Sequence, residues 1–228
     1  MQRFFLFCNM KNTLIINKTV QFVKETLQGA EGGHDWFHIE RVWKNAKLIA
    51  KNENVDLFII ELGALLHDIA DAKFYDGDES IGPKKANAFL KSLSVNEDVI
   101  QHIINIINNI SYKNSLELNA IKFHSKELDV IQDADRLDAI GAIGIARAFN
   151  YGGFKNRELY NPEIKPNINL SKESYKKSKA PTINHFYEKL LLLKDLMNTK
   201  TGQKIAKERH VFMEQYLEQF YSEWNGNK

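Results

Sequence analysis

The 228-residue chain predicts an all-α fold: one helical bundle with a long loop before two C-terminal helices. Apolar residues recur three and four positions apart through most of the chain, as expected for helices that cover one core. No stretch alternates apolar and polar residues over a useful length, which argues against strands. Hydrophobic residues make up 43% of the chain, enough for a substantial core.

The N-terminal third predicts three helices after a frayed tail over residues 1–11. Gly29 ends the first helix, because glycine commonly stops a helix. The third helix is expected to be central, since the run from Leu57 to Leu66 is apolar on nearly all sides. The first two helices show apolar stripes at Leu14, Val20, Val23 and Leu27, and at Ile39, Val42, Trp43, Ala46, Ile49 and Ala50.

The middle of the chain predicts a loop over residues 71–81 and then three further helices. Gly82-Pro83 opens the first of them, with proline at a first-turn position. Ser94 and Glu97 have the spacing of a capping box for the second helix. Ser125 is expected to cap the third.

The C-terminal third predicts a long loop from Tyr151 to Pro181, rich in glycine, proline and polar residues. A loop of this length inside a compact domain is commonly functional. Two helices follow, over residues 182–197 and 201–224. Since no linker separates two cores, one domain over residues 12–225 is expected.

Composition excludes several classes of protein. The net charge of +2 arises from 31 basic and 29 acidic residues, which gives no support for stable nucleic-acid binding. The one cysteine, Cys8, excludes an intramolecular disulfide and fits a reducing compartment. No segment offers the roughly 20 apolar residues that a membrane span needs. A cytoplasmic protein is therefore expected.

Histidine and aspartate residues from three segments form a candidate metal site. His67-Asp68 ends the apolar run, His34 lies upstream, and the acidic stretch 133–138 lies downstream. Two imidazoles and two carboxylates can hold one divalent ion, which lowers the pKa of bound water. Spacing alone does not choose among the acidic residues Asp133, Asp135 and Asp138. Taken alone, His67-Asp68 also fits a buried core histidine beside a helix-capping aspartate.

This ordered pattern resembles the HD-domain superfamily of metal-dependent phosphohydrolases, and more closely a bacterial subgroup of single-domain proteins. The matching motifs run from Gly33 to Val42, from Leu66 to Asp71, from Gln132 to Ala139, from Asn184 to Leu190 and from Arg209 to Met213. The resemblance implies metal ligation by His34, His67, Asp68 and Asp135. It also implies hydrolysis of nucleoside triphosphates with release of pyrophosphate.

Further residues are candidates for catalysis, each with a structural alternative. His38 lies four positions after His34 on the same helical face and could contact phosphate or serve the core. Asp68 is assigned to the catalytic centre as well as to the metal. Asp71 could accept a proton from water or simply end a helix.

Four basic residues are candidates for binding the substrate, again with alternatives. Arg41 could bind a phosphate or form a surface ion pair. Lys73, Lys155 and Arg157 could meet phosphate oxygens from loops, although loop lysines are usually solvated.

The expected function is a hydrolase that uses one divalent ion, with Mn first and Mg, Co, Ni, Fe or Zn as alternatives. Its partner is a small phosphorylated substrate, expected to be a nucleotide, and a homodimer is compatible with the sequence. A non-catalytic nucleotide sensor is the first alternative. A di-iron oxygenase is the second, and would require extra histidines such as His102 or His124.

Overall fold

The computed structural model describes residues 2–30, 33–70, 78, 80–110, 123–168 and 179–228. Within these ranges the chain forms helices and no strand, which confirms the all-α prediction. The chain gathers into two compact units, Met1–Ile131 and Gln132–Lys228, and each is described by itself. The expectation of one domain over residues 12–225 stays a prediction.

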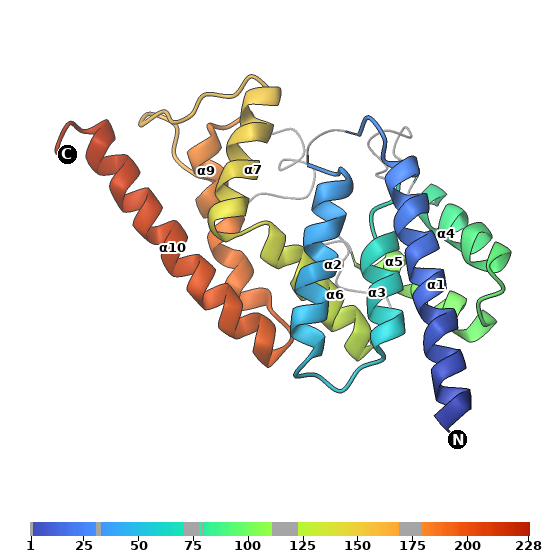
Figure 1. The fold of residues 1–228 in the computed structure, drawn as a ribbon. Coiled ribbons are helices and arrows are strands. Elements are labelled where there is room, and N and C mark those ends of the chain that lie inside the picture. Colours follow the sequence, from blue (N-terminus) through green and yellow to red (C-terminus); the bar gives the residue numbers. More distant parts are fainter. Residues whose placement is uncertain (1, 31–32, 71–77, 79, 111–122, 169–178) are drawn as a thin grey trace. The chain divides into compact units, whose positions relative to one another are not determined.

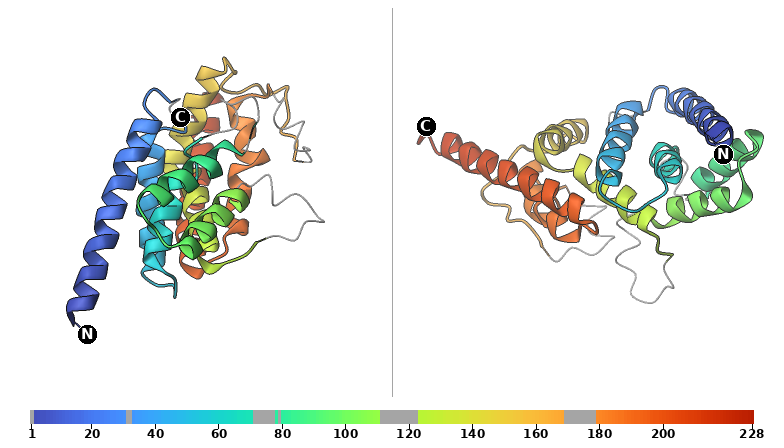
Figure 2. Two further views of the ribbon diagram at one scale, coloured as in Figure 1. Left: turned by 90° about the vertical axis from the view of Figure 1, so that its right-hand side faces the viewer. Right: turned by 60° about the horizontal axis from the view of Figure 1, so that its bottom comes forward.

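The first unit is built around a central apolar helix. Its helices are α1 (Gln2–Thr26), α2 (Trp36–Ala50), α3 (Leu57–Leu66), α4 (Ile81–Ser92), α5 (Glu97–Asn109) and the first turns of α6 (Lys126–Asp138). Helices α1, α2 and α5 all contact α3, most of whose residues are buried, as predicted from its apolar run (Figure 1). Helix α4 packs against α5 (Figure 2).

Side-chain caps fix where α2 and α3 begin. Asp35 accepts a hydrogen bond from the backbone N–H of His38, and Asp56 accepts one from that of Phe58 at 2.8 Å. The two helices pack side by side and run in opposite directions, joined by the short segment 51–56 (Figure 1). The start of α2 and the end of α3 therefore lie at the same end of this unit.

Two details of the first unit differ from prediction. Helix α1 begins at Gln2 rather than after residue 11, since no glycine or proline interrupts residues 2–26. Leu14 is 56% exposed, and the buried side of α1 comprises Ile15, Ile16, Thr19 and Val23.

The cap of α5 also differs from prediction. Asn96, not Ser94, precedes the helix and accepts a hydrogen bond from the N–H of Asp98. Ser94 has a φ of 52°, a turn conformation that takes it out of the capping position. The predicted cap of α6 is confirmed, because Ser125 accepts a hydrogen bond from the N–H of Leu128.

The second unit contains the remainder of α6, α7 (Gly141–Phe154), α9 (Thr182–Glu188), the 3-10 helix η3 (Leu190–Leu196) and α10 (Lys200–Trp224). Helix α10, the long red helix of Figure 1, packs on α7 and η3, and α9 packs on η3 and α7. The loop predicted from Tyr151 begins only after Phe154. The helix predicted over residues 182–197 is two helices, because Lys189 leaves helical geometry at φ −146° and ψ −57°.

None of the helices in the described ranges is long and apolar enough to cross a membrane.

Candidate metal centre

Four candidate side chains of the first unit gather where α2 begins and α3 ends. His34 stands just before the N-cap Asp35, and His38 lies one turn into α2. His67 is the C-terminal cap residue of α3, and Asp68 follows it. Antiparallel packing of α2 on α3 thus unites residues that are 29–34 positions apart in the sequence.

His34 and Asp68 form a direct pair. The Nδ1 of His34 lies 2.5 Å from Oδ2 of Asp68, and the two side chains are 27% and 21% exposed. Burial acts to raise the pKa of Asp68. The hydrogen bond from His34 and the positive charges of His34, His67 and His38 outweigh it and lower that pKa to about 2. Asp68 is therefore a carboxylate at neutral pH, as a metal ligand must be.

His38 and His67 are buried imidazoles that face each other. Their ring centroids lie 5.4 Å apart in an edge-on arrangement, and His38 has a similar contact with His34 at 6.0 Å. Ligand nitrogens of His38 and His67 lie within 4.8 Å of each other. Two ring nitrogens at this separation are close enough to serve as ligands of one cation.

A backbone contact sets the proton position on His67. Its Nδ1 lies 2.8 Å from the carbonyl oxygen of Ala64, and a carbonyl can only accept a hydrogen bond. Nδ1–H therefore donates, and in the neutral ring the lone pair is on Nε2. Orientation of a ligating histidine by a backbone carbonyl is the usual arrangement at metal sites.

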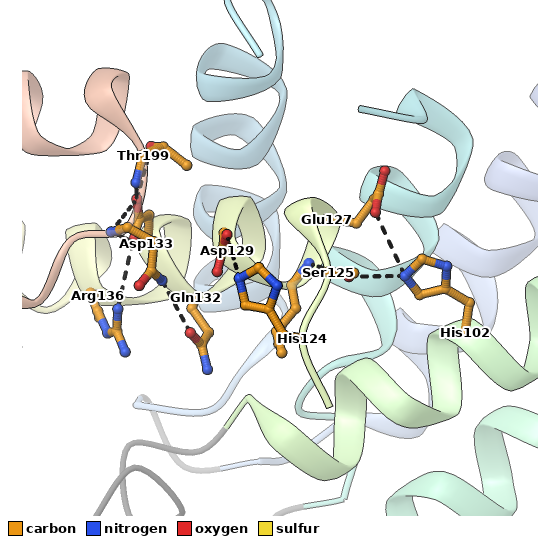
Figure 3. Close-up of polar contacts among 11 residues, drawn as sticks. His102, His124, Ser125, Glu127, Asp129, Gln132, Asp133, Arg136 and Thr199 are labelled. Atoms are coloured by element: carbon orange, nitrogen blue, oxygen red, sulfur yellow. Dashed lines mark hydrogen bonds and ion pairs between the residues drawn. The ribbon is translucent and has the colours of Figure 1, made fainter. Parts of the chain in front are cut away.

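In the second unit, two aspartates of the acidic stretch of α6, Asp133 and Asp138, form structural contacts. Asp133 is fully buried, and its carboxylate accepts hydrogen bonds from the backbone N–H groups of Asn198 and Thr199 and from the hydroxyl of Thr199, at 2.7–2.8 Å for the shortest of each (Figure 3). Asp138 is 1% exposed and accepts from Arg147 at 2.7 Å. Asp135 is partly exposed on the same helix.

These contacts bear on which of the three aspartates could bind a metal ion, a choice that spacing left open. Burial raises the pKa of Asp133, and the hydrogen bonds from Asn198 and Thr199 act in the opposite direction. The carboxylate of Asp133 thus holds the start of α10 through hydrogen bonds. The carboxylate of Asp138 is paired with Arg147. Neither role could be read from the sequence, because each partner is known only once the chain has folded. The cap signature of Thr199 before α10 was the one available signal.

The donor atoms gathered in the first unit fit a borderline divalent cation. Imidazole nitrogen with carboxylate oxygen suits Mn, Fe, Co, Ni and Zn. The alternative in which Asp68 only caps a helix is less favoured, since its carboxylate contacts the imidazole of His34. Three imidazoles and one carboxylate at one end of an apolar helix pair would be costly to bury without a function.

The remaining candidates are one residue of α2, two residues of the second unit and two residues outside the described ranges. Arg41 is partly buried on α2, one turn beyond His38. In the second unit, the Nζ of Lys155 lies 4.7 Å from the centre of the Phe154 ring, and the Cζ of Arg157 lies over Tyr151. Asp71 and Lys73 lie outside the described residues.

The two histidines considered for an oxygenase have other partners within the first unit. Nε2 of His102 lies 3.0 Å from the hydroxyl of Ser125 and 3.7 Å from a carboxylate oxygen of Glu127 (Figure 3). His124 pairs with Asp129 at 3.1 Å. Both contacts hold the start of α6, so the structure gives the oxygenase alternative no support.

Comparison with known proteins identifies the family to which this arrangement belongs. The HD-domain family model matches residues 36–140, which include His38, His67, Asp68 and Asp135. YpgQ of Bacillus subtilis, described as uncharacterized, is 38% identical over 198 residues, covering 87% of this chain and 88% of its own.

Solved structures of related proteins match this chain over nearly its whole length. An HD-superfamily hydrolase from Bacillus thuringiensis is 44% identical, with a TM-score of 0.74 over 94% of this chain and 98% of its own. YpgQ in complex with ADP is 35% identical, with a TM-score of 0.74 over 93% of this chain and 96% of its own.

Proposed function

The chain belongs to the HD-domain superfamily and is a metal-dependent hydrolase, and from that premise we propose that its substrates are nucleotides. The proposed reaction cleaves a nucleoside triphosphate to the monophosphate and pyrophosphate, with removal of a terminal phosphate as the alternative. The observation that carries the proposal is the group of His34, His38, His67 and Asp68 at one end of α2 and α3. The ADP complex of YpgQ supports a nucleotide ligand.

We propose His34, His67, Asp68 and Asp135 as the metal ligands, following the order of the family motifs. A bound divalent ion would supply an activated water and neutralise phosphate charge. His34 and Asp68 already lie in contact, with Nδ1 of His34 2.5 Å from Oδ2 of Asp68, and would both supply ligand atoms to a divalent ion, with Asp68 as a carboxylate. The carbonyl of Ala64 keeps the Nε2 lone pair of His67 turned away from the helix that carries it.

The neighbouring residues are proposed to handle the proton and the substrate. Asp71, three positions after Asp68, is the proposed acceptor of the proton lost by the attacking water. His38, buried between His34 and His67, is proposed to contact a phosphate oxygen while holding the adjacent rings in place.

Four basic residues are proposed to bind the phosphates. They are Arg41, Lys73, Lys155 and Arg157. Cationic groups at fixed positions orient a polyanion and stabilise charge that develops in the transition state.

A nucleotide panel tests this function. Purified protein is incubated with each nucleoside triphosphate and Mn, Mg, Co or Ni, and phosphate and pyrophosphate are measured separately. Pyrophosphate release that disappears in Asp68→Ala, with helical content retained, is the expected result. Nucleotide and metal binding without any hydrolysis would instead support the non-catalytic sensor.

A further inference from the structure

An arginine interrupts the buried stripe of α10 in the second unit. The buried residues of this helix are Gly202, Ala206, Met213 and Leu217, and Arg209 falls between them at helical spacing, four positions before Met213. Side chains at this spacing lie on the same face of a helix. A charged side chain in such a stripe is uncommon unless it has a partner, so the contacts of Arg209 indicate what it does there.

The side chain of Arg209 contacts the end of α6. Its guanidinium donates a hydrogen bond to the backbone carbonyl of Leu137, 72 positions earlier in the chain. A Cβ on Gly141 would lie 3.0–3.2 Å from side-chain carbons of Arg209, so the aliphatic stem of the arginine rests on the first residue of α7. Arg209 therefore joins α10 to the end of α6 and to the start of α7.

A second arginine reaches the same turn from α7. Arg147 donates to the backbone carbonyl of Asp138 at 3.2 Å and to its carboxylate at 2.7 Å, and Asp138 is the last residue of α6. Burial lowers the pKa of the Arg209 guanidinium, and the negative charge of Asp138 acts in the opposite direction. Two arginines from two helices thus donate to the carbonyls of the successive residues Leu137 and Asp138.

These donors supply a part of α6 that the helix cannot supply itself. The last four carbonyls of an α-helix have no N–H partner within the helix, and in α6 they belong to residues 135–138. The backbone N–H of Ile140 donates to the carbonyl of Leu137 at 3.3 Å, and the two arginines add the contacts described above. Positive charge at this end of a helix also stabilises the helix dipole. The last turn of α6 is therefore held by α7 and α10.

We propose that Arg209 is a positioning residue for the metal centre, because it holds the last turn of α6 and thereby places Asp135 before the cation binds. Asp135 lies in that turn. The inference rests on the proposed function, since it requires Asp135 to be a metal ligand. A ligand on a frayed helix end would have to be ordered when the cation arrives, which lowers affinity. Loss of a group that orients a ligand weakens metal binding by roughly 10- to 100-fold.

The sign of the effect separates positioning from simple electrostatics. A positive charge beside the turn that carries Asp135 repels a cation, so its removal would strengthen Mn binding if charge alone acted. Removal of the donor that holds the turn should weaken binding instead. Arg209→Met is the test variant, because methionine keeps much of the aliphatic stem on Gly141 and lacks the guanidinium. Arg209→Lys, the milder change, keeps the charge and a donor.

Titration of the EDTA-stripped protein with Mn, followed by calorimetry at constant pH and ionic strength, measures the effect. Arg209→Met should weaken Mn binding by about tenfold or more, and Arg209→Lys should weaken it less. Met213→Ala is the matched control, because it removes buried packing from the same face of α10 and no hydrogen-bond donor. It should lower the free energy of unfolding and leave Mn affinity within about twofold.

A double-mutant comparison shows whether Arg209 acts through Asp135. Asp135→Ala should itself weaken Mn binding, and adding Arg209→Met should then change affinity by less than about twofold, because the positioned carboxylate is gone. Arg209→Lys should show a smaller loss that also vanishes in this background, which keeps the test open if Arg209→Met does not fold. A merely structural arginine would give equal losses in both backgrounds.

The outcomes distinguish this inference from the proposed function. Unchanged or stronger Mn binding in Arg209→Met, an equal loss in Met213→Ala, or equal losses with and without Asp135 would overturn the positioning role and leave the proposed ligands standing. Unchanged Mn binding in Asp135→Ala would overturn the ligand assignment, and the positioning role with it.

Discussion

At the scale of single residues, the contact between His34 and Asp68 sets the charge of the candidate centre. A short hydrogen bond and three neighbouring imidazoles keep the Asp68 carboxylate ionised in a largely buried position. The lowered pKa of Asp68 should also affect the stability of the metal-free protein. A pKa that differs between the folded and unfolded states makes the free energy of unfolding depend on pH.

The stability that Asp68 contributes should be lost in acid. Its pKa is lowered from 3.8 to about 2, so its contribution is complete above about pH 4 and disappears as the pH falls toward 2. That contribution corresponds to about 2 kcal/mol. Urea unfolding of EDTA-treated protein and of Asp68→Asn measures it. The difference in unfolding free energy should shrink between pH 4 and pH 2, and a difference that stays constant over that range would contradict this account.

Asp133 is a residue whose role is structural. Asp133→Ala would leave the buried N–H and hydroxyl groups of Thr199, and the N–H of Asn198, without their acceptor, and should cost roughly 3 kcal/mol of stability. Chemical denaturation measures the loss. The control Asp195→Ala removes an exposed carboxylate that pairs with Lys194, and should change stability little. A similar cost for both variants would show that Asp133 does not hold α10 in this way.

At the scale of elements, Gly202 allows the first turn of α10 to lie close to Asp133 of α6. A Cβ on Gly202 would lie 2.4 Å from Oδ2 of Asp133, and that carboxylate is held by hydrogen bonds and cannot move aside. Gly202→Ala should therefore destabilise the protein by about 1–3 kcal/mol, despite the helical preference of alanine.

A double-mutant comparison tests the cause of that loss. In the Asp133→Ala background the oxygen is absent, so Gly202→Ala should cost clearly less than in the wild-type chain. Gly153→Ala on α7, where a Cβ meets nothing within 4 Å, is the matched control and should be neutral or slightly stabilising. Thermal unfolding of the four variants gives the coupling, and equal costs in both backgrounds would exclude the steric explanation.

The elements also show what the sequence could predict. The apolar stripes of α2 and α3 are buried as predicted, since a helix that faces a core must repeat its apolar residues at helical spacing. The break at Lys189 and the cap at Asn96 were missed, because local backbone angles settle both. The group of His34, His38, His67 and Asp68 was within reach of sequence reasoning through its motifs. The partners of Asp133 were not, because they come from a segment about 65 residues further along the chain.

At the scale of the whole molecule, the similarity of this chain to solved relatives extends well beyond the stretch matched by the HD-domain model. The HD-domain model matches residues 36–140, whereas the solved relatives cover 93–94% of the chain. His34 lies before the matched stretch, and α7, α9 and α10 follow it. The residues outside the matched stretch are thus part of the same fold, and they include Lys155 and Arg157, two of the four basic residues proposed to bind the phosphates.

Turnover measured as a function of bound manganese tests the central claim most directly. The protein is stripped with EDTA and reloaded with increasing Mn, and bound metal per chain and pyrophosphate released from nucleoside triphosphates are determined on the same samples. Activity should be absent from the stripped protein and rise in proportion to bound metal up to one ion per chain. Full turnover by protein that holds no metal would contradict the account.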